Sequence, residues 1–190
     1  DYSGYAVSLS ADGTTLAIGA FGNDGTSTDA GHVRVYKYTP GKTVAVTNQA
    51  DASFGPIGWN RLGADIDGEA AYDRSGTGVS LSADGTVLAI GAHQNNSNTG
   101  HVRVYKYTPT KTVAVTSQTD ASFGPIGWNR LGADIDGEAF NDYSGADVAL
   151  SADGTIIAIA ASQNDGTASD AGHVRVYKYT PSKKIGRAHV

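Results

Sequence analysis

Hydrophobic and polar positions alternate with a period of two along three related stretches of the chain. They are residues 8–20 (SLSADGTTLAIGA), 80–92 (SLSADGTVLAIGA) and 149–161 (ALSADGTIIAIAA). In each stretch two alternating runs flank an Asp-Gly pair, a pattern typical of a β-hairpin. Large apolar side chains fall on one face of the predicted hairpin, and Ser, Ala and Gly fall on the other. We therefore expect stacked sheets, with the bulky face of one against the thin face of the next; the alternative is a hairpin with one solvent-exposed face.

The hairpins belong to a repeat whose units are 69 to 72 residues apart. The segment GHVRVYKYTP begins at Gly31, Gly100 and Gly172, and WNRLGADIDGEA begins at Trp59 and Trp128. All variation in length falls in the loop after each hairpin, at residues 21–30, 93–99 and 162–171. Strands of fixed length with one variable loop per unit predict a tandem-repeat architecture.

Each complete unit contains four predicted strands and no predicted helix. In the first unit these strands cover about residues 5–10, 15–20, 31–39 and 59–66, and residues 43–47 add a further short strand or a flap. Leu62 and Ile66 are expected to point inward. The units span about residues 1–72, 73–141 and 142–184, and four strands per stacked unit is the arrangement of a β-propeller blade.

Composition narrows the class of protein without naming a function. The 190 residues are 39% hydrophobic, carry a net charge of −5 and include no Cys. This mild charge gives no electrostatic footprint for nucleic acid, no apolar run is long enough for a membrane span, and no disulfide or thiolate metal site can form. Residues 185–190 (IGRAHV) depart from the repeat, and we interpret them as the translation of a sequencing adapter, a non-biological tail.

The order of these parts resembles the FG-GAP-like repeats of the integrin α-chain type of β-propeller. The resemblance is carried by residues 59–92, the Asn/Asp/Gly-rich loop that follows, and GHVRVYKY, and it covers residues 1–183. It implies an all-β fold: a partial β-propeller of repeated four-stranded antiparallel blades, with under three blades present and the propeller incomplete at both ends. It also implies an extracellular or cell-surface location and a protein or glycan ligand on the loop rim, with the missing blades of the same chain as further partners.

Calcium is the one cofactor that the resemblance suggests. In this sequence, however, the predicted calcium ligands stand in a different loop from the usual calcium loop of the family. Blades of this family often carry a loop of the form DxDxDGxxD in the first hairpin, where this chain has only SADGT with one carboxylate. Carboxylates at relative positions 1, 3, 5 and 9 instead follow the fourth strand: Asp65, Asp67, Glu69 and Asp73, and again Asp134, Asp136, Glu138 and Asp142. Oxygen ligands at this spacing predict a calcium loop, although Gly stands at the fourth position rather than the sixth. The alternative is a set of Asp-Gly turns in which these side chains bond local backbone.

No catalytic constellation stands out in the repeats. Every Ser and Asp recurs within a turn, and no phosphate-binding glycine loop is present. His32, His101 and His173 each open a strand, where we expect a local hydrogen bond. Trp59 and Trp128 are expected to pack between blades rather than to form a carbohydrate-stacking surface. We therefore expect a non-catalytic binding or adhesion module, the alternatives being the propeller domain of a secreted glycan-active enzyme and a structural surface-array repeat with no ligand site.

Overall fold

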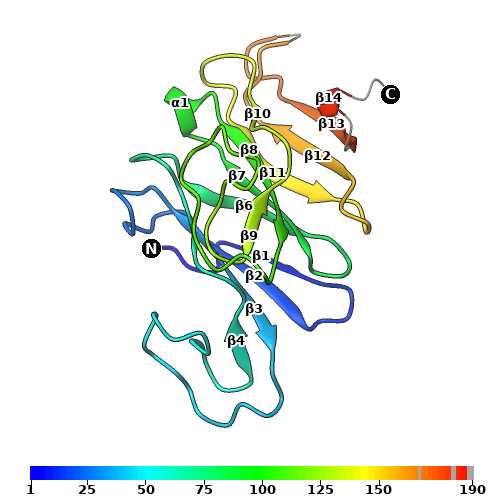
Figure 1. Cartoon of the computed structure of the whole chain (residues 1–190). Helices are drawn as coiled ribbons and strands as arrows, with labels where there is room; N and C mark the ends of the chain where they lie inside the picture. Colours follow the sequence, from blue (N-terminus) through cyan, green and yellow to red (C-terminus); the bar gives the residue numbers. More distant parts are fainter. Residues whose placement is uncertain (167, 181–182, 188–190) are drawn as a thin grey trace.

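The computed structural model describes residues 1–166, 168–180 and 183–187. It confirms the predicted all-β class, because three antiparallel sheets follow one another along the chain and lie side by side (Figure 1). Sheet 2 lies in the middle and shares an apolar core with each of its neighbours.

The three sheets share one plan. Sheet 1 contains β1 (Ala6–Leu9), β2 (Thr15–Ala20), β3 (His32–Tyr38), β4 (Trp59–Arg61) and β5 (Ile66–Asp67). Sheet 2 contains β6 (Ser75–Leu81), β7 (Val87–Ala92), β8 (His101–Tyr107), β9 (Trp128–Arg130) and β10 (Ile135–Asp136). Sheet 3 contains β11 (Ser144–Leu150), β12 (Ile156–Ala161), β13 (His173–Thr180) and β14 (Lys183–Arg187). In every sheet the first three strands run up and down in chain order, each paired with the next.

The predicted fourth strand is interrupted in the first two sheets. In sheet 1, β4 and β5 both pair with β3, but the segment between them leaves the ladder. There Gly63 adopts a φ of 75°, and the Ala64 N–H donates a 2.9 Å hydrogen bond to the carbonyl oxygen of Ile126 in the next unit. The strand of sheet 2 is interrupted at the equivalent point, where Gly132 adopts a φ of 74°, so the break coincides in both units with a glycine in the left-handed region. Leu62 and Ile66 pack into the first core, as predicted.

Residues 43–47 form the flap alternative rather than an extra strand. They contribute one isolated bridge, between Val46 and Gly55. The Lys42 ammonium in the same loop donates hydrogen bonds of 2.9 and 2.8 Å to the carbonyl oxygens of Gly55 and Trp59. One cation therefore ties this long loop together. A second loop holds α1 (Asn95–Asn98), a single turn with positive φ inside it and not a regular helix.

The SADG turns are fixed by their own side chains. In the first turn the Ser10 hydroxyl donates to the Asp12 carboxylate at 2.6 Å and accepts from the Thr15 N–H at 2.9 Å. These bonds, with that from Ser10 foremost, hold the pKa of Asp12 well below its usual range. Gly13 supplies the φ of 68° that the turn requires. The same bonds recur in the other two hairpins, so the Asp-Gly pattern predicted the turns correctly.

Apolar cores lie between successive sheets. We call one face of each sheet bulky and the other thin: in sheet 1 the bulky face carries Val7, Leu9, Leu16 and Ile18, and the thin face carries Ala17, Gly19, Val33 and Val35. The first core joins the thin face of sheet 1 to Val79, Leu81, Leu88 and Ile90 on the bulky face of sheet 2. The second core joins the thin face of sheet 2 to the bulky face of sheet 3 in the same way. The predicted stacking of bulky on thin faces is confirmed for both junctions.

Two glycines on the thin faces mark the closest approach of the sheets. A Cβ added at Gly19 would overlap the carbonyl oxygen of Gly76, and a Cβ added at Gly91 would overlap that of Gly145. Any side chain at this position would therefore push the sheets apart.

Serine hydroxyls on the thin faces also bond the next sheet directly. Ser8 Oγ accepts a 2.9 Å hydrogen bond from the Leu81 N–H, and Ser80 Oγ accepts one of 2.9 Å from the Leu150 N–H. Each junction thus combines apolar packing, a glycine contact and one side-chain acceptor for a strand amide.

Sheet 3 is completed by the part of the chain that departs from the repeat. β14 pairs with β13 in the register in which β4 pairs with β3: Tyr177 faces Arg187 as Tyr36 faces Arg61. Residues 185–187 of the predicted adapter tail thus occupy the place of a fourth strand, and residues 188–190 lie outside the described residues. The origin of the tail stays a prediction, which the sequence of the parent DNA decides.

Candidate functional site

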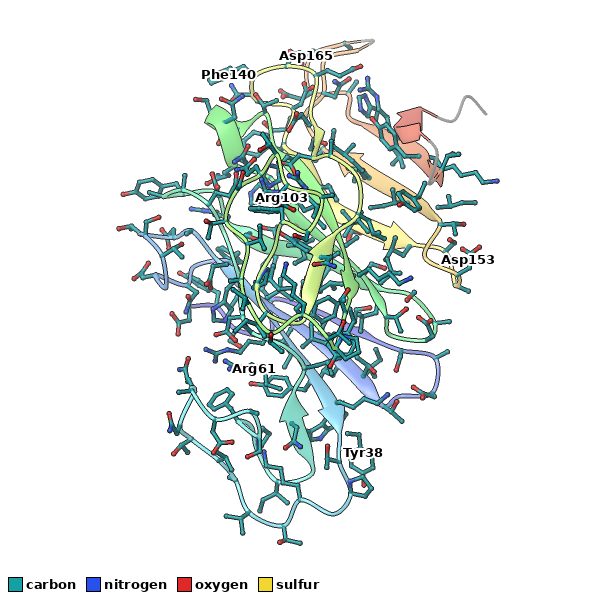
Figure 2. All side chains as sticks on the ribbon, viewed as in Figure 1. Tyr38, Arg61, Arg103, Phe140, Asp153 and Asp165 are labelled. Carbon is teal, nitrogen blue, oxygen red and sulfur yellow. The ribbon has the colours of Figure 1, made fainter. Side chains whose placement is uncertain are left out.

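One edge of the molecule brings the variable loops together. Loops 21–30, 93–99 and 162–171 each join the second and third strands of a sheet, and segments 68–74 and 137–143 connect successive sheets. We call these five segments the loop rim. In the view of Figure 2, Phe140 and Asp165 of the rim lie at the upper end of the molecule, away from the hairpin turn at Asp153.

Backbone hydrogen bonds make the loop rim continuous. They run from Tyr72 N–H to Thr28 O (2.8 Å), from Gln94 N–H to Asp73 O (3.4 Å), from Tyr143 N–H to Asn98 O (2.9 Å) and from Gln163 N–H to Asp142 O (3.3 Å). Each variable loop is therefore held by a connecting segment. The loops can differ in sequence while the edge that carries them keeps its position.

The connecting segments present large aromatic side chains to solvent. Tyr72 is 58% exposed and Phe140 is 66% exposed. The sequence analysis missed both, because they occupy different positions in their repeat units, and considered Trp59 and Trp128 instead. Trp128 is fully buried and donates its indole N–H to the carbonyl oxygen of Leu62 at 3.0 Å, which confirms its predicted packing role.

Asp73 and Asp142, the last carboxylates of the two predicted calcium sets, organise the connecting segments. Both are buried. Asp73 accepts a 3.0 Å hydrogen bond from the Ala70 N–H, and Asp142 accepts one of 2.9 Å from the Ala139 N–H and one of 2.9 Å from the Asn164 amide. The bonds from Ala70 and Ala139 are the local bonds of the Asp-turn alternative, whereas the bond from Asn164 ties Asp142 to the following variable loop.

Asp65 and Asp134, the first carboxylates of the two sets, each bridge two arginines of their own sheet. The ion pairs are Asp65 with Arg34 (2.7 Å) and Arg61 (3.1 Å), and Asp134 with Arg103 (2.5 Å) and Arg130 (2.7 Å). Burial raises the pKa of both carboxyls, but the hydrogen bonds and charges of the arginines outweigh it, so each pKa falls below its usual value. Phe54 and Phe123 stack against these arginines in sheets 1 and 2.

Glu69 and Glu138 reach across to the following sheet. Glu69 forms an ion pair with Arg103 of sheet 2, and Glu138 forms one with Arg175 of sheet 3. Arg103, whose side chain is only 6% exposed, therefore contacts Asp134 within its own sheet and Glu69 from the segment that leaves sheet 1. This guanidinium fastens sheet 2 to sheet 1.

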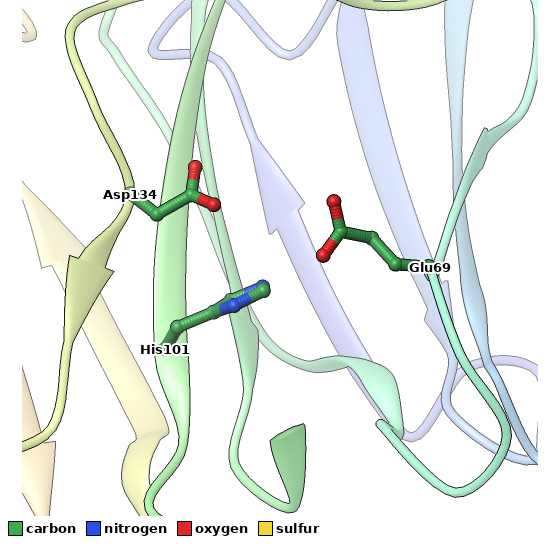
Figure 3. Close-up of side chains that lie close together, drawn as sticks. All are labelled: Glu69, His101 and Asp134. Atoms are coloured by element: carbon green, nitrogen blue, oxygen red, sulfur yellow. The ribbon is translucent and has the colours of Figure 1, made fainter. Parts of the chain in front are cut away.

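The same ion pairs explain a group that resembles a metal site. Figure 3 shows Glu69, His101 and Asp134 converging, and one ligand atom of each lies within 4.8 Å of the others. Burial, followed by the charge of Arg103, lowers the pKa of His101, so the imidazole is neutral at pH 7. Arg103 pairs with both carboxylates, and its guanidinium supplies the positive charge between them. The sequence analysis missed this group, because it expected only a local hydrogen bond for each histidine and did not consider a carboxylate of the preceding unit beside it.

Three carboxylates of each predicted calcium set line one small cavity. The cavity between sheets 1 and 2 has a volume of about 10 Å³ and is lined by Asp67, Glu69, Asp73, His101 and Arg103, among others. The cavity between sheets 2 and 3 has the same volume and is lined by the equivalent residues Asp136, Glu138, Asp142, His173 and Arg175. Such a volume holds about one water molecule. Asp65 and Asp134 do not line either cavity.

We expect millimolar calcium to leave the melting temperature of the chain unchanged. Four of the eight predicted ligands, Asp65, Glu69, Asp134 and Glu138, already pair with arginine, and calcium would have to displace these cations. A ligand that binds only the folded state must raise the melting temperature. Thermal melts followed by circular dichroism, with calcium and with chelator, measure this. A rise that the chelator reverses, and that Asp67→Asn removes, would instead establish the calcium site.

Within the described residues, no helix has the length and apolar character needed to cross a bilayer. No protein-family model matches this chain, and no curated protein matches it.

Proposed function

We propose that the three sheets are blades of an FG-GAP-like β-propeller and that the chain is a non-catalytic recognition or adhesion module of an extracellular or cell-surface protein. Its binding surface is the loop rim, and its ligand is a protein or a glycan. The observation that carries this proposal is the contrast between three sheets of one plan and three loops that differ on a single edge.

The loop rim has the physical properties of a recognition surface. A rigid scaffold positions loops whose sequences vary, which is the common arrangement in binding proteins. The backbone bonds between loops and connecting segments supply that rigidity, since every variable loop accepts or donates at least one of them.

Exposed aromatic side chains add contact area to the loop rim. Tyr72 and Phe140 are large, project from the connecting segments and are not used in either core. Aromatic side chains dominate the energetics of protein interfaces and stack on sugar rings. The Asn, Asp, Ser and Thr side chains of the neighbouring loops offer hydrogen bonds around them.

We expect the double variant Tyr72→Ala/Phe140→Ala to lose at least about tenfold in affinity for the ligand, because removing an interface aromatic commonly costs more than 1.4 kcal/mol. The first measurement is binding of the whole chain to an array of defined glycans and to a panel of extracellular matrix proteins. The variant is then compared with wild type on whichever probe binds.

Two controls separate binding from folding. Val113→Ala alters a side chain that is equally exposed but lies outside the loop rim, and it should leave binding unchanged. Replacing loop 21–30 by the sequence of loop 93–99 should change the binding profile and leave the melting temperature within a few degrees of wild type. No binding on either panel, or unchanged binding by both rim variants, would refute the proposal.

A further inference from the structure

The bulky face of sheet 1 has no covering sheet among the described residues, although its composition is that of an internal face. Val7 and Leu9 of β1 are 62% and 58% exposed, whereas the equivalent Val79 and Leu81 of β6 are 8% and 7% exposed beneath sheet 1. The same side chains are thus core residues in one sheet and surface residues in another. The junctions inside the molecule show what a partner must offer in order to cover them.

A thin face that accepts a bulky face has three features. It carries Gly at the position of closest approach, Gly19 or Gly91. It carries Ala or Gly at the residue paired with that glycine, Ala6 or Gly78. It also carries a serine whose hydroxyl accepts a hydrogen bond from a leucine amide of the incoming first strand.

The thin face of sheet 3 lacks all three features. Its residues at these positions are Ala160, Asp147 and Ala149. Ala160 carries the Cβ that overlaps a carbonyl oxygen at the internal junctions, Asp147 places a carboxylate in an apolar contact, and Ala149 offers no acceptor. Apolar area remains on this face, since Val174 is 65% exposed and Ile156 is 41% exposed, but the contacts that fix the junction are missing.

We propose that the chain has one docking surface of this kind, the bulky face of sheet 1, and that its partner is a further sheet of the same repeat with Gly and Ser on its thin face. The thin face of sheet 3 does not accept a sheet packed as the internal sheets are, so a blade next to that face would have to pack through different contacts. A second copy of this chain is therefore not the partner, because among the described residues the one thin face that it leaves free is that of sheet 3. This specificity comes from three side chains on one face.

The contacts of Arg34 in sheet 1 support the same choice of partner. Arg103 and Arg175 each receive a glutamate from the preceding unit. Arg34, at the equivalent position, pairs with Asp65 and with the side-chain oxygen of Gln49, and no described residue reaches it from another sheet. The partner sheet is thus expected to bring a glutamate on the segment that follows it. This inference concerns sheet stacking and does not depend on the loop rim.

The test replaces three thin-face residues of sheet 3 with the residues that stand at the equivalent positions of sheet 2. Wild type should sediment as a monomer of 19.5 kDa at all soluble concentrations. The triple variant Asp147→Gly/Ala149→Ser/Ala160→Gly should associate head to tail, with a mass at least twice that of wild type. Adding Leu9→Lys to the triple variant should restore the monomer, since it places a charge in the bulky face of sheet 1. Circular dichroism melts establish that each variant is folded.

Three outcomes would overturn the proposal. One is self-association of wild type, and another is a folded triple variant that stays monomeric at its solubility limit. The third is association of the triple variant that Leu9→Lys leaves intact, because the contact would then not involve the bulky face of sheet 1.

Discussion

Arg103→Met should destabilise the chain by about 3–5 kcal/mol, the cost of breaking a buried ion pair and leaving its carboxylates uncompensated. Arg103 is the central cation of the junction between sheets 1 and 2, because Glu69 and Asp134 both pair with it. Methionine keeps the length of the apolar stem and removes the charge. Urea unfolding followed by circular dichroism at pH 7 measures the free energy of unfolding.

The repeat supplies a matched control for this substitution. Arg34→Met removes the equivalent cation from sheet 1, where the side chain is 23% exposed and no glutamate of another sheet reaches it within the described part of the chain. Its cost should be about 1–3 kcal/mol, that of a hydrogen-bonded pair in partial contact with water. Equal losses for the two variants would show that the link between Arg103 and Glu69 contributes nothing measurable.

The loss in Arg103→Met should also shrink in acid. Arg103 depresses the pKa of Asp134 against the opposing effect of burial, so this carboxylate stabilises the fold above its unfolded pKa near 3.8, and the contribution disappears as pH falls through the lower folded pKa. Once Asp134 is protonated, the arginine has one charge fewer to compensate. A difference between wild type and variant that stays constant from pH 7 to about pH 3 would assign the loss to packing of the stem instead.

Trp128→Ala should cost about 3–5 kcal/mol, and Trp59→Ala less than half as much, because the first opens a cavity in a closed core. Trp128 has no exposed surface, packs between sheets 1 and 2 and donates to the Leu62 carbonyl oxygen. Trp59 has the same sequence context in the first unit but is only partly buried, and it stacks edge-on against Tyr38. Urea unfolding of both variants gives the comparison.

Comparing the two alanine variants also separates the contribution of packing between sheets from that of packing within one sheet. If the two substitutions cost the same, the indole contributes within its own sheet and not at the junction. If only Trp128→Ala is costly, the contact between neighbouring units carries the difference. Trp128→Phe, which keeps one aromatic ring but removes the indole N–H and part of the buried volume, then shows how much of the cost a single ring recovers.

The sequence predicted those features that depend on neighbouring residues. A period of two and an Asp-Gly pair are local signals, so the hairpins, their turns and the division into bulky and thin faces could be predicted. The interruption of the fourth strand was missed, although a glycine stands there in both units (Gly63 and Gly132), and the bond from Ala64 to Ile126 of the next unit could not be predicted. No local pattern reports a backbone bond between residues so far apart.

At the candidate site, too, spacing along the chain could not predict which residues from distant parts of the sequence make contact. Spacing along the chain grouped Asp65 with Glu69, but the fold sends Asp65 to arginines of its own sheet and Glu69 to an arginine of the next. A usable signal was present: the Arg of HVRVYKY and the first Asp of GADIDG recur 31 residues apart in both complete units.

The strand ladders on either side of the variable loops make this chain a natural scaffold for grafting. The second and third strands pair in the same register at Ala20 with His32, Ala92 with His101 and Ala161 with His173, although eleven, eight and eleven residues lie between these partners. Loop length is thus decoupled from strand alignment. Foreign peptides could be displayed side by side at three sites, each anchored at both ends, with the spacing between them set by the distance from one sheet to the next.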